Sequence, residues 1–476
     1  MNWETVIGLE IHAQLNTKSK IFSASSTEYG AKPNTQASLV DLGYPGVLPV
    51  LNQKVIDYAV KFGLATNCEI SSETIFSRKN YFYPDLPKGY QISQLDQPIV
   101  HSGYVDIEIN GGPKRIRITR AHLEEDAGKS MHNNETHSSY IDLNRAGVPL
   151  LEIVSEPDMS NAKEAIEYMK YIHLLVRYLG ICDGNLQEGS FRCDANVSIR
   201  RPGDNLGTRT EIKNLNSFRF IEKAINYEVD RQIELIESGS IIKQETRLYD
   251  DENGITRSMR SKEESNDYRY FPDPDLLPIT ISKEFIDSIK SKLPELPNAK
   301  NNRFINDLKL SEDDAKRLIE NPQLSIFFED TARLTKKANS NQVSNWIIGK
   351  ISSMLNEKNI AIDEFKLSSQ KLAQIIDKVC DGTLSQNLGS KLIELAYDSE
   401  QDIEAIISEK SLSQISDLNA INKIIDKVLA SNAEQIQEYK AGNQKIIGYL
   451  IGQTMKLSGG KVNPNTAKEL LHKKLG

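Results

Sequence analysis

The sequence predicts an α+β protein, with a mixed or antiparallel sheet in its N-terminal part and helices alone in its C-terminal part. Before about residue 293, segments that alternate apolar and polar residues, the period of a half-buried strand, are interspersed with two long amphipathic helical patterns. After that point helical patterns dominate, aromatic residues are few and glycine is sparse. A chain of 476 residues exceeds what one hydrophobic core supports, so we expect two to four domains.

The composition, with 39% hydrophobic and 26% charged residues, is that of an ordinary globular protein. A net charge of −8 argues against a dedicated nucleic-acid coat, so any RNA binding must use local basic patches. The first residues lack the pattern of a signal peptide, and no apolar run approaches the thickness of a bilayer. The four cysteines are far apart and indicate neither a disulfide framework nor a zinc site. We therefore expect a cytoplasmic protein without membrane association.

The first predicted strand covers residues 5–15, TVIGLEIHAQL. Its aliphatic residues fall on one face, which leaves Gly8, Glu10 and His12 on the other. A carboxylate and an imidazole two residues apart project in parallel and can form half of a metal site, although a solvated outer face gives the same pattern. Gly8 removes bulk beside this pair, as a site that a ligand approaches requires.

A loop rich in glycine and proline follows over residues 41–52, and the next pattern predicts a helix over Gln53–Ala65. Residues 78–94, RKNYFYPDLPKGYQISQ, then combine Lys79 and Lys88 with four aromatic residues. Such a segment can bind a nucleotide or single-stranded RNA through ring stacking and phosphate contacts. A rigid proline turn with aromatic side chains in the core explains the segment equally well.

The centre of the predicted sheet is the segment Ile118–Ser130, ITRAHLEEDAGKS. A strand with the pattern KRIRIT leads directly into Glu124, Glu125 and Asp126. Adjacent carboxylates repel one another unless a cation or a proton resolves the conflict. Hard divalent cations such as Mg²⁺ bind to such oxygens, usually together with substrate phosphates. A solvated acidic turn is the simpler alternative, but other segments repeat the same design.

Later segments add further strands with one apolar and one polar face, so the natural assembly is a sheet with a polar concave face over helices. Helices are expected from Asn161, with Glu164 completing a capping box, to Gly180, and from about Ser217 to Ser238. The strand-rich segments are residues 140–158, with Asn144, Arg145, Glu152 and Glu156; residues 187–200, with Ser190, Arg192 and Asp194; and residues 210–216, with Glu211 and Lys213.

From about Lys292 the composition changes, and the sequence PELPN resembles a linker. Lys445, Lys456 and Lys461 near the end of the chain suit a phosphate backbone, although a helical packing seam explains that segment as well. Helices are expected over Glu312–Glu320, Gln342–Lys358, Ser369–Val379 and Ala420–Leu429.

Taken together, these segments resemble the B subunits of the bacterial aspartyl/glutamyl-tRNA amidotransferases. The matching motifs appear in that family's order, cover essentially the whole chain, and are far more specific as a series than singly. They are VIGLEIH, YPGVLPVLN, RKNYFYPDLPKGYQISQ, LEEDAGK, DLNRAGVPLLEIVSEPD, GSFRCDANVS and DYRYFPDPD.

The resemblance implies a heterotrimer with an amidase subunit and a small third subunit. It implies ATP-dependent phosphorylation of the carboxylate of Glu-tRNA(Gln) or Asp-tRNA(Asn), followed by displacement of phosphate by ammonia that the amidase releases from glutamine. Such an enzyme is a ligase that forms carbon–nitrogen bonds. The implied domains are a cradle with the kinase and transamidase site over residues 1–293, a helical domain over 294–405, and an α-helical tail over 406–476 that binds tRNA.

The resemblance also implies roles for individual residues. Glu10, His12 and Glu125 are similar to Mg²⁺ ligands, and Lys79 and Lys88 to lysines of the ammonia channel or of phosphate binding. We expect Glu125→Gln to stop phosphorylation and to change stability by about 0.5 kcal/mol or less, as at a surface position. The implied catalytic residues are Lys79, Lys88, Glu124, Glu125, Arg192 and Asp194, and those implied for ATP are Lys79, Tyr81, Lys88, Asn144, Glu152, Ser190 and Arg192.

One departure from the family pattern concerns zinc. Many members have four cysteines, as C-x-C and C-x-x-C, where this chain has Ser23, Ser25, Ser38 and Asp41. Because no thiolate set remains there, the cofactors expected are ATP and Mg²⁺ without structural zinc. Two other functions fit parts of the sequence: a ligase for a small carboxylate and an amine, which would not depend on RNA, and a non-catalytic scaffold that binds tRNA.

Overall fold

The computed structural model describes residues 2–109, 112–133, 137–213, 215, 217–261, 265–412, 415 and 417–475. These residues form two compact units, with the division between Pro297 and Asn298. The first unit contains every strand that the structure describes, and the second is helical. The α+β prediction is therefore confirmed.

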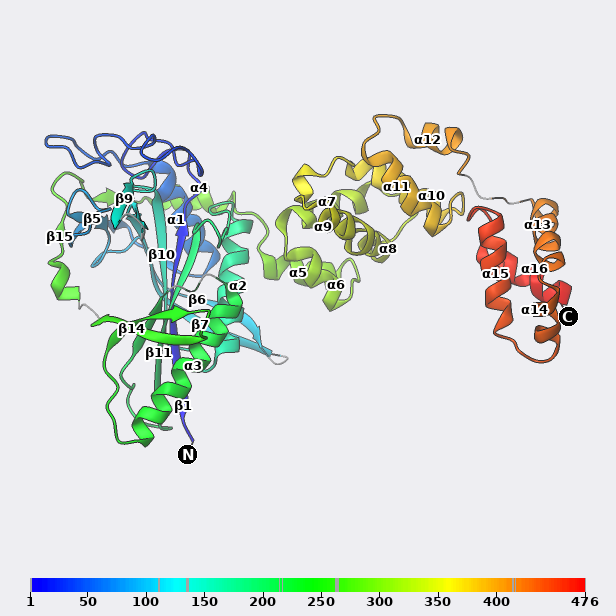
Figure 1. Ribbon diagram of the computed structural model, residues 1–476. Coiled ribbons are helices and arrows are strands. Elements are labelled where there is room, and N and C mark those ends of the chain that lie inside the picture. The colour runs from blue at the N-terminus through cyan, green and yellow to red at the C-terminus, as the bar shows by residue number, and fades with distance from the viewer. Residues whose placement is uncertain are drawn as a thin grey trace. The chain divides into compact units, whose positions relative to one another are not determined.

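A nine-stranded sheet is the frame of the first unit (Figure 1). All neighbouring strands in it are antiparallel except β12 and β13, which are parallel. The N-terminal strand β1 lies in the middle, between two strands from much later in the chain. In spatial order the strands are β14 (Ile255–Ser261), β13 (Glu245–Asp250), β12 (Thr210–Lys213), β11 (Phe191–Arg200), β1 (Glu4–Gln14), β10 (Pro149–Ser155), β7 (Gly112–Glu125), β6 (Val100–Ile109) and β2 (Glu69–Ile70).

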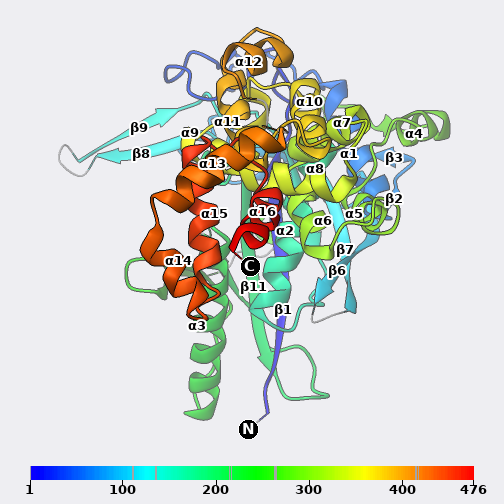
Figure 2. The ribbon, with the colours of Figure 1, turned by 90° about the vertical axis from the view of Figure 1, so that its right-hand side faces the viewer.

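Three smaller sheets accompany the large one. The ribbon of β8 and β9 extends away from the body of the first unit (Figure 2). The strands of these sheets are β15 (Phe271–Pro272), β4 (Ser77–Asn80) and β5 (Tyr90–Ser93) in the first; β16 (Ile279–Thr280) and β3 (Glu73–Thr74) in the second; and β8 (Lys129–Asn133) and β9 (Ser138–Asp142) in the third.

Helices α1 (Gln53–Ala65), α2 (Ala162–Tyr178) and α3 (Phe218–Glu237) pack against the large sheet. The aliphatic side chains of β1 and its neighbours are buried in the core that these helices share. Each fully buried aliphatic side chain of this kind contributes roughly 1.5 to 3 kcal/mol. The alternation of β1 thus places its apolar residues under helices and its polar residues on the opposite face.

The predicted helices of the first unit are confirmed within one or two residues. Asn161 caps α2 by accepting the backbone N–H of Glu164 at 3.0 Å, and the Glu164 carboxylate accepts the backbone N–H of Ser160 at 2.7 Å. The first unit also contains a 3₁₀ helix over Ser265–Tyr268 and helix α4 over Lys283–Lys290.

The second unit has two hydrophobic clusters, one over residues 304–412 and one over residues 421–475. The predicted helix over Gln342–Lys358 consists of α8 (Ser340–Trp346), a π-helical turn (Ile347–Ile351) and α9 (Ser352–Lys358). The division into domains at residues 294 and 406 stays a prediction. The other helices are α5 (Pro297–Asn306), α6 (Glu312–Ile319), α7 (Pro322–Leu334), a 3₁₀ helix (Ile362–Glu364), α10 (Ser369–Cys380), α11 (Gln386–Tyr397), α12 (Ile403–Glu409), α13 (Leu418–Ala430), α14 (Ala433–Lys440), α15 (Ile446–Leu457) and α16 (Pro464–Leu475).

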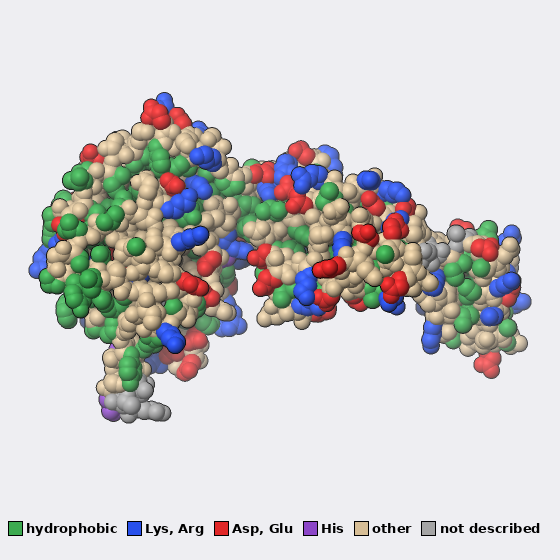
Figure 3. Space-filling model, turned by 90° about the horizontal axis from the view of Figure 1, so that it is seen from above, with side chains coloured by type: hydrophobic (Ala, Val, Ile, Leu, Met, Phe, Trp, Pro, Cys, Tyr) green, Lys and Arg blue, Asp and Glu red, His purple; other side chains and the backbone are tan. Residues whose placement is uncertain are grey.

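Basic and acidic side chains are interspersed over the second unit on the face that Figure 3 shows. Such a surface provides local basic patches rather than one continuous positive field. Among the described residues, no helix is both long enough and apolar enough to cross a membrane.

Candidate active site

The face of the sheet opposite the helices has a row of polar residues across four adjacent strands. Strand register aligns Arg192 of β11 with His12 of β1, His12 with Glu152 of β10, and Glu152 with His122 of β7. Residues directly opposite one another in neighbouring strands place their side chains on the same face, about 5 Å apart. Four segments far apart in the sequence thus form one continuous polar surface.

Part of this row forms the first of two groups that could hold a metal ion. We call it the histidine group: His12, Glu124 and Glu152, each offering a ligand atom within 4.8 Å of the others. His12 Nε2 lies 3.5 Å from a Glu152 oxygen and 3.8 Å from a Glu124 oxygen. His122 Nε2 lies 3.3 Å from the same Glu152 oxygen, so two imidazoles lie beside two carboxylates.

The charges of this group shift the pKa values of its members. Burial alone lowers the pKa of His122, but the charges of Glu152 and Glu124 outweigh burial and raise that pKa to about 9. The pKa of His12 is also raised: burial lowers it, but the hydrogen bond and charge of Glu152, together with the charge of Glu124, outweigh burial. Burial raises the pKa of Glu152, yet the two histidines hold it well below its usual value. The carboxylates therefore need positive charge beside them, which protons on the histidines or a divalent cation can supply.

The second group consists of Glu10 of β1, Asp194 of β11 and Glu211 of β12, and we call it the acidic group. Lys213 forms ion pairs with Asp194 and, at 3.4 Å, with Glu211. Burial lowers the pKa of Lys213, but these two carboxylates raise it above its usual value. Three carboxylates around one ammonium leave an excess of negative charge, and their oxygens are the ligands that Mg²⁺ prefers.

Asp126 joins the histidine group to the neighbouring pocket. It is buried, and its carboxylate accepts hydrogen bonds from Arg192 at 2.8 Å and from Gln14 at 2.9 Å. Arg145 lies 3.7 Å from the same carboxylate. Burial raises the pKa of Asp126, but the two arginines lower it below its usual value. Asp126 is thus a permanent negative charge that holds two arginines in place.

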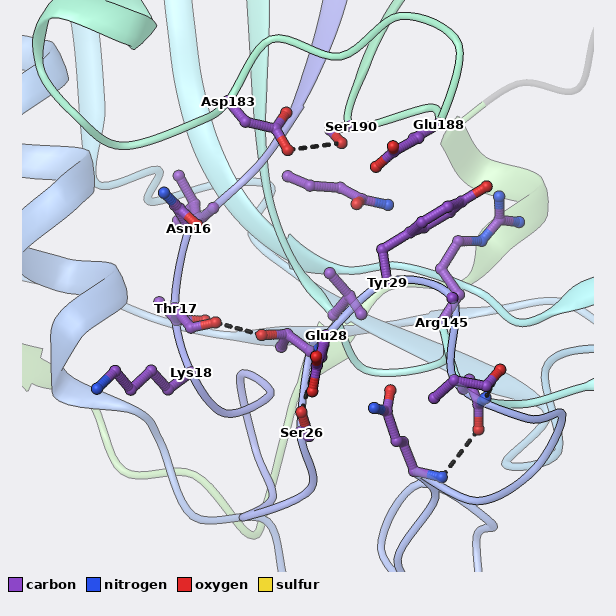
Figure 4. Close-up of a pocket in the computed structure, with 18 of the residues that line it drawn as sticks. Asn16, Thr17, Lys18, Ser26, Glu28, Tyr29, Arg145, Asp183, Glu188 and Ser190 are labelled. Atoms are coloured by element: carbon purple, nitrogen blue, oxygen red, sulfur yellow. Dashed lines mark hydrogen bonds between the residues drawn. The ribbon is translucent and has the colours of Figure 1, made fainter. Parts of the chain in front are cut away.

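The pocket has a volume of about 760 Å³ and lies beside the end of β1 (Figure 4). Its basic side chains are Lys18, Lys129 and Arg145, and the exposed ring of Tyr29 lies across it. Asn144 and Ser190, both predicted to contact ATP, line the same pocket. Four carboxylates, those of Glu28, Asp142, Asp183 and Glu188, also line the pocket, so its walls carry charges of both signs. Its volume and the ring of Tyr29 suit a nucleotide, whose phosphates would contact the three cations.

Glu125 lies apart from the two groups. Its carboxylate is buried, forms an ion pair with Lys88 and accepts the backbone N–H of Ile92 at 2.8 Å. The structure therefore does not bring Glu125 together with Glu10 and His12, which themselves belong to different groups. Glu125 is thus not the surface position on which the expectation of a small stability effect for Glu125→Gln was based, and the change would remove the ion-pair partner of the half-buried Lys88.

The placement of Glu124 and Glu125 has a physical cause. In β7, Ile116 and Ile118 belong to the hydrophobic core, but after an irregularity in the pairing with β10 the residues in that core are Ala121 and Leu123. This shift reverses which residues face the helices. An unbroken alternation would place Glu125 on the polar face, whereas the shift places Glu124 there.

Lys79 and Tyr81 belong to an aromatic cluster around the small sheet of β4. The Lys79 ammonium lies 4.8 Å from the centre of the Tyr268 ring, and the Tyr81 hydroxyl donates to Gln91 at 3.2 Å. Burial, followed by the charge of Glu124, raises the pKa of both Tyr81 and Tyr270. The aromatic cluster therefore lies close enough to Glu124 for the charge of that carboxylate to act on its tyrosines.

His122, Glu211 and Asp126 were not among the predicted site residues. His122 and Glu211 lie on alternating strands that the sequence did reveal, but only the register shows that they face the other site residues. Asp126 was recognised as one of three adjacent carboxylates, but only the structure shows that it holds Arg192 and Arg145.

Three of the four positions compared with cysteines above, Ser23, Ser38 and Asp41, form a cluster with Lys20, which we call the Lys20 cluster. Lys20 is completely buried, with its ammonium 3.5 Å from Asp41 and 3.3 Å from the Leu143 carbonyl. Asp41 also accepts the Ser23 hydroxyl at 3.0 Å and the Ser38 backbone N–H at 2.7 Å. Burial lowers the pKa of Lys20, and Asp41 opposes that effect. An ammonium ion thus occupies the centre of the cluster.

A sheet face with two carboxylate groups suited to cations, beside a large pocket lined by charges of both signs, is the arrangement of a catalytic domain. Comparison with known proteins agrees: residues 5–287 match the family described as the GatB/GatE catalytic domain, and residues 326–475 match the GatB domain. The aspartyl/glutamyl-tRNA(Asn/Gln) amidotransferase subunits B of Thioalkalivibrio sulfidiphilus, Ectopseudomonas mendocina and Nitrosococcus oceani are 55%, 56% and 54% identical to this chain. Each alignment covers the whole of both chains. The chain belongs to this family of amidotransferase B subunits, which confirms the resemblance.

Proposed function

We propose that this chain is the B subunit of a cytoplasmic tRNA-dependent amidotransferase, a ligase with glutamine as its amido donor. In this proposal it uses ATP to phosphorylate the side-chain carboxylate of Glu-tRNA(Gln) or Asp-tRNA(Asn). Ammonia from a partner amidase subunit, in a heterotrimer with a small third subunit, then displaces the phosphate. The observation that supports this most is the alignment of two carboxylate groups on one sheet face beside a pocket of about 760 Å³ that includes three basic side chains.

The donor sets fit divalent cations. The histidine group offers one imidazole and two carboxylates, and the acidic group offers three carboxylates. Mg²⁺ takes oxygen ligands and keeps several waters, which such open sets allow. Bound cations would neutralise phosphate oxygens and stabilise the charge that develops during phosphoryl transfer.

The chain's own residues bind and orient the two reactants. Lys18, Lys129 and Arg145 attract the phosphates of ATP into the larger pocket, and Tyr29 offers a ring for stacking. Arg192, held by Asp126 and aligned with His12, supplies positive charge at the border between that pocket and the histidine group. These charges are fixed before the reaction begins, so they need little reorganisation as the phosphoryl group moves.

Phosphorylation is needed because a carboxylate is a poor electrophile. One carboxylate oxygen attacks the γ-phosphorus, ADP leaves, and ammonia then attacks the carbonyl carbon and expels phosphate, giving Gln-tRNA(Gln) or Asn-tRNA(Asn). We also propose that Lys79 and Lys88 act near the phosphates or the ammonia path. The tail over residues 406–476 is proposed to bind tRNA. Lys445, Lys456 and Lys461 support the last of these.

The test uses the reconstituted complex with ATP and mischarged tRNA. Glu152→Gln and Glu211→Gln each remove the charge of one potential ligand and keep its shape, so ATP cleavage that depends on mischarged tRNA should fall by about 10² to 10³. Glu108→Gln, an exposed glutamate in β6, is the matched control and should retain full activity.

Two results would redirect the assignment. Full activity of both variants would favour a scaffold that binds tRNA without taking part in the chemistry. ATP cleavage that is unaffected by omission of tRNA would favour a ligase for a small carboxylate.

A further inference from the structure

A second, smaller pocket of about 160 Å³ lies on the same face of the sheet as the two groups. Its floor is the first part of β1, from Val6 to Glu10, with side walls from β10 and β11. Leu206 and Arg209, from the loop before β12, form its outer wall. Glu10 belongs both to this pocket and to the acidic group.

The two pockets lie at opposite ends of the same row of side chains. Gly8, Glu10, His12 and Gln14 alternate along β1 toward one face, about 7 Å apart from each to the next. Gln14 lines the larger pocket, His12 and Glu10 belong to the two groups, and Gly8 lines the smaller pocket. The order along the strand is therefore larger pocket, histidine group, acidic group, smaller pocket.

Neither backbone conformation nor close packing requires a glycine at position 8. Its φ is not in the left-handed region, and a Cβ built on it would lie no closer than 3.8 Å to any neighbour. A glycine inside a strand costs roughly 0.5 to 1 kcal/mol relative to alanine. The absent side chain has one evident effect, which is to leave space in the smaller pocket.

A second glycine, Gly207, holds the outer wall of the pocket in place, and unlike Gly8 it has no room for a side chain. A Cβ on Gly207 would lie 2.2 Å from the Ile199 carbonyl oxygen, so only glycine lets the loop lie this close to β11. This contact fixes Leu206 and Arg209 over the pocket. The space above Gly8 is thus a bounded site rather than an open surface.

We propose that the smaller pocket holds the aminoacyl group of the charged tRNA, with its side-chain carboxylate toward the acidic group and its methylenes over Gly8. This inference rests on the proposed function. Phosphoryl transfer requires the two reactants to meet at the cations from opposite sides, and the larger pocket has the volume and the cations that a nucleotide needs. A volume of about 160 Å³ is too small for ATP and suits an amino acid.

The chemistry of the walls agrees with an aminoacyl ester. Val6, Val154 and Leu206 provide an apolar lining for methylenes. The Ser155 hydroxyl accepts the Leu9 backbone N–H at 2.9 Å, so its hydrogen can be donated to an ester carbonyl. Arg209 is exposed at the rim, where it can contact a phosphate of the tRNA 3′ end.

The test replaces Gly8 in the reconstituted complex. Gly8→Ala and Gly8→Val fill the space above β1 by steps, and Gly112→Ala at the start of β7 makes the same kind of change where no atom lies within 4 Å. Binding of mischarged and deacylated tRNA is compared for each. The wild type and Gly112→Ala should prefer mischarged tRNA, and Gly8→Val should lose that preference without any loss of affinity for deacylated tRNA.

Kinetics give a second measurement. The kcat/KM for mischarged tRNA should fall at least tenfold in Gly8→Val and less in Gly8→Ala, while the KM for ATP stays unchanged. A Gly8→Val complex that keeps both the binding preference and its kcat/KM overturns the inference. If thermal unfolding shows that Gly8→Val does not fold, Gly8→Ala decides by the same measures.

The two proposals fail in different ways. A wild-type complex that shows no ATP cleavage dependent on mischarged tRNA overturns the proposed function. A wild-type complex that cleaves ATP in this way, with Gly8 variants equal to Gly112→Ala, overturns only the assignment of the pocket.

Discussion

The Lys20 cluster and the histidine group both surround carboxylates in the interior of the first unit, but they balance charge differently. In the Lys20 cluster a buried ammonium belongs to the chain itself and lies 3.5 Å from Asp41. In the histidine group two imidazoles lie beside the two carboxylates, and the charge of Arg192 also acts on Glu124. The carboxylates raise the pKa of both histidines, but an imidazole that gives up its proton to a competing cation becomes a metal ligand itself.

The difference separates a structural cluster from a site that exchanges its cation. The Lys20 cluster is complete, because an imported metal would have to displace an ammonium that is covalently part of the protein. The histidine group can exchange protons for a divalent cation, since neutral imidazole and carboxylate are metal ligands. A carboxylate paired with a lysine thus forms a fixed contact, whereas carboxylates beside imidazoles form a site that can bind a cation.

The largest effect is expected when the Lys20 cluster is broken. Asp41→Asn leaves the buried Lys20 without a counter-ion, and the free energy of unfolding should fall by about 3 to 5 kcal/mol at pH 7. Denaturant unfolding measures this change. The double variant Lys20→Met/Asp41→Asn removes both charges and should recover most of the loss.

The loss should depend on pH in a defined direction. Without Asp41, folding must depress the pKa of Lys20 further below its usual value, so the unfolded state binds more protons than the folded state. Stability of Asp41→Asn should therefore rise from pH 7 toward pH 10, by at most about 1.4 kcal/mol per pH unit. A deficit that stays constant over this range would show that Lys20 is not the source of the loss.

A smaller effect is expected from magnesium at the two groups. Free Mg²⁺ at 100 times its dissociation constant should stabilise the wild type by about 2.7 kcal/mol per site. Glu152→Gln and Glu211→Gln should each lose part of this gain, whereas Asp41→Asn should keep all of it. Thermal unfolding with and without Mg²⁺ measures the difference, and equal gains in all variants would contradict the distinction between the clusters.

Removal of zinc is expected to have no effect on the stability of the protein. Because the Lys20 cluster offers one carboxylate and an ammonium in place of thiolates, a strong zinc chelator should leave the unfolding temperature unchanged. Metal analysis of protein purified without added zinc provides the independent check. Tightly held zinc at one ion per chain would refute the prediction.

Much of the fold could be predicted because each element has a local signal. The alternation of residues 5–15 placed Glu10 and His12 on one face, and the structure agrees. The pattern after residue 52 predicted a helix over Gln53–Ala65, and α1 has those bounds. Local periodicity does not depend on the rest of the chain, so a single sequence is enough to reveal it.

The site could be predicted only in part, because its geometry depends on register. Glu10 lies opposite Asp194, and no local pattern states which strands become neighbours. The choice between Glu124 and Glu125 depended on an irregularity in β7 that the pattern KRIRIT does not reveal. Lys20 was missed because a lysine normally remains in water, and only the folded chain shows the carboxylate and carbonyl that surround it.

The central position of β1 determines when the protein can become functional during its synthesis. β1 is made first, but its neighbours are β10, which ends at Ser155, and β11, which ends at Arg200. At about 5 to 20 residues per second, the ribosome needs roughly 10 to 40 s after making β1 to finish β11. Throughout that interval the apolar side chains of β1 lack their final partners, so the nascent chain exposes a strand that other chains or chaperones can bind. Because β1 comes first in the chain and lies between later strands, the catalytic face can form only after β11 has been made.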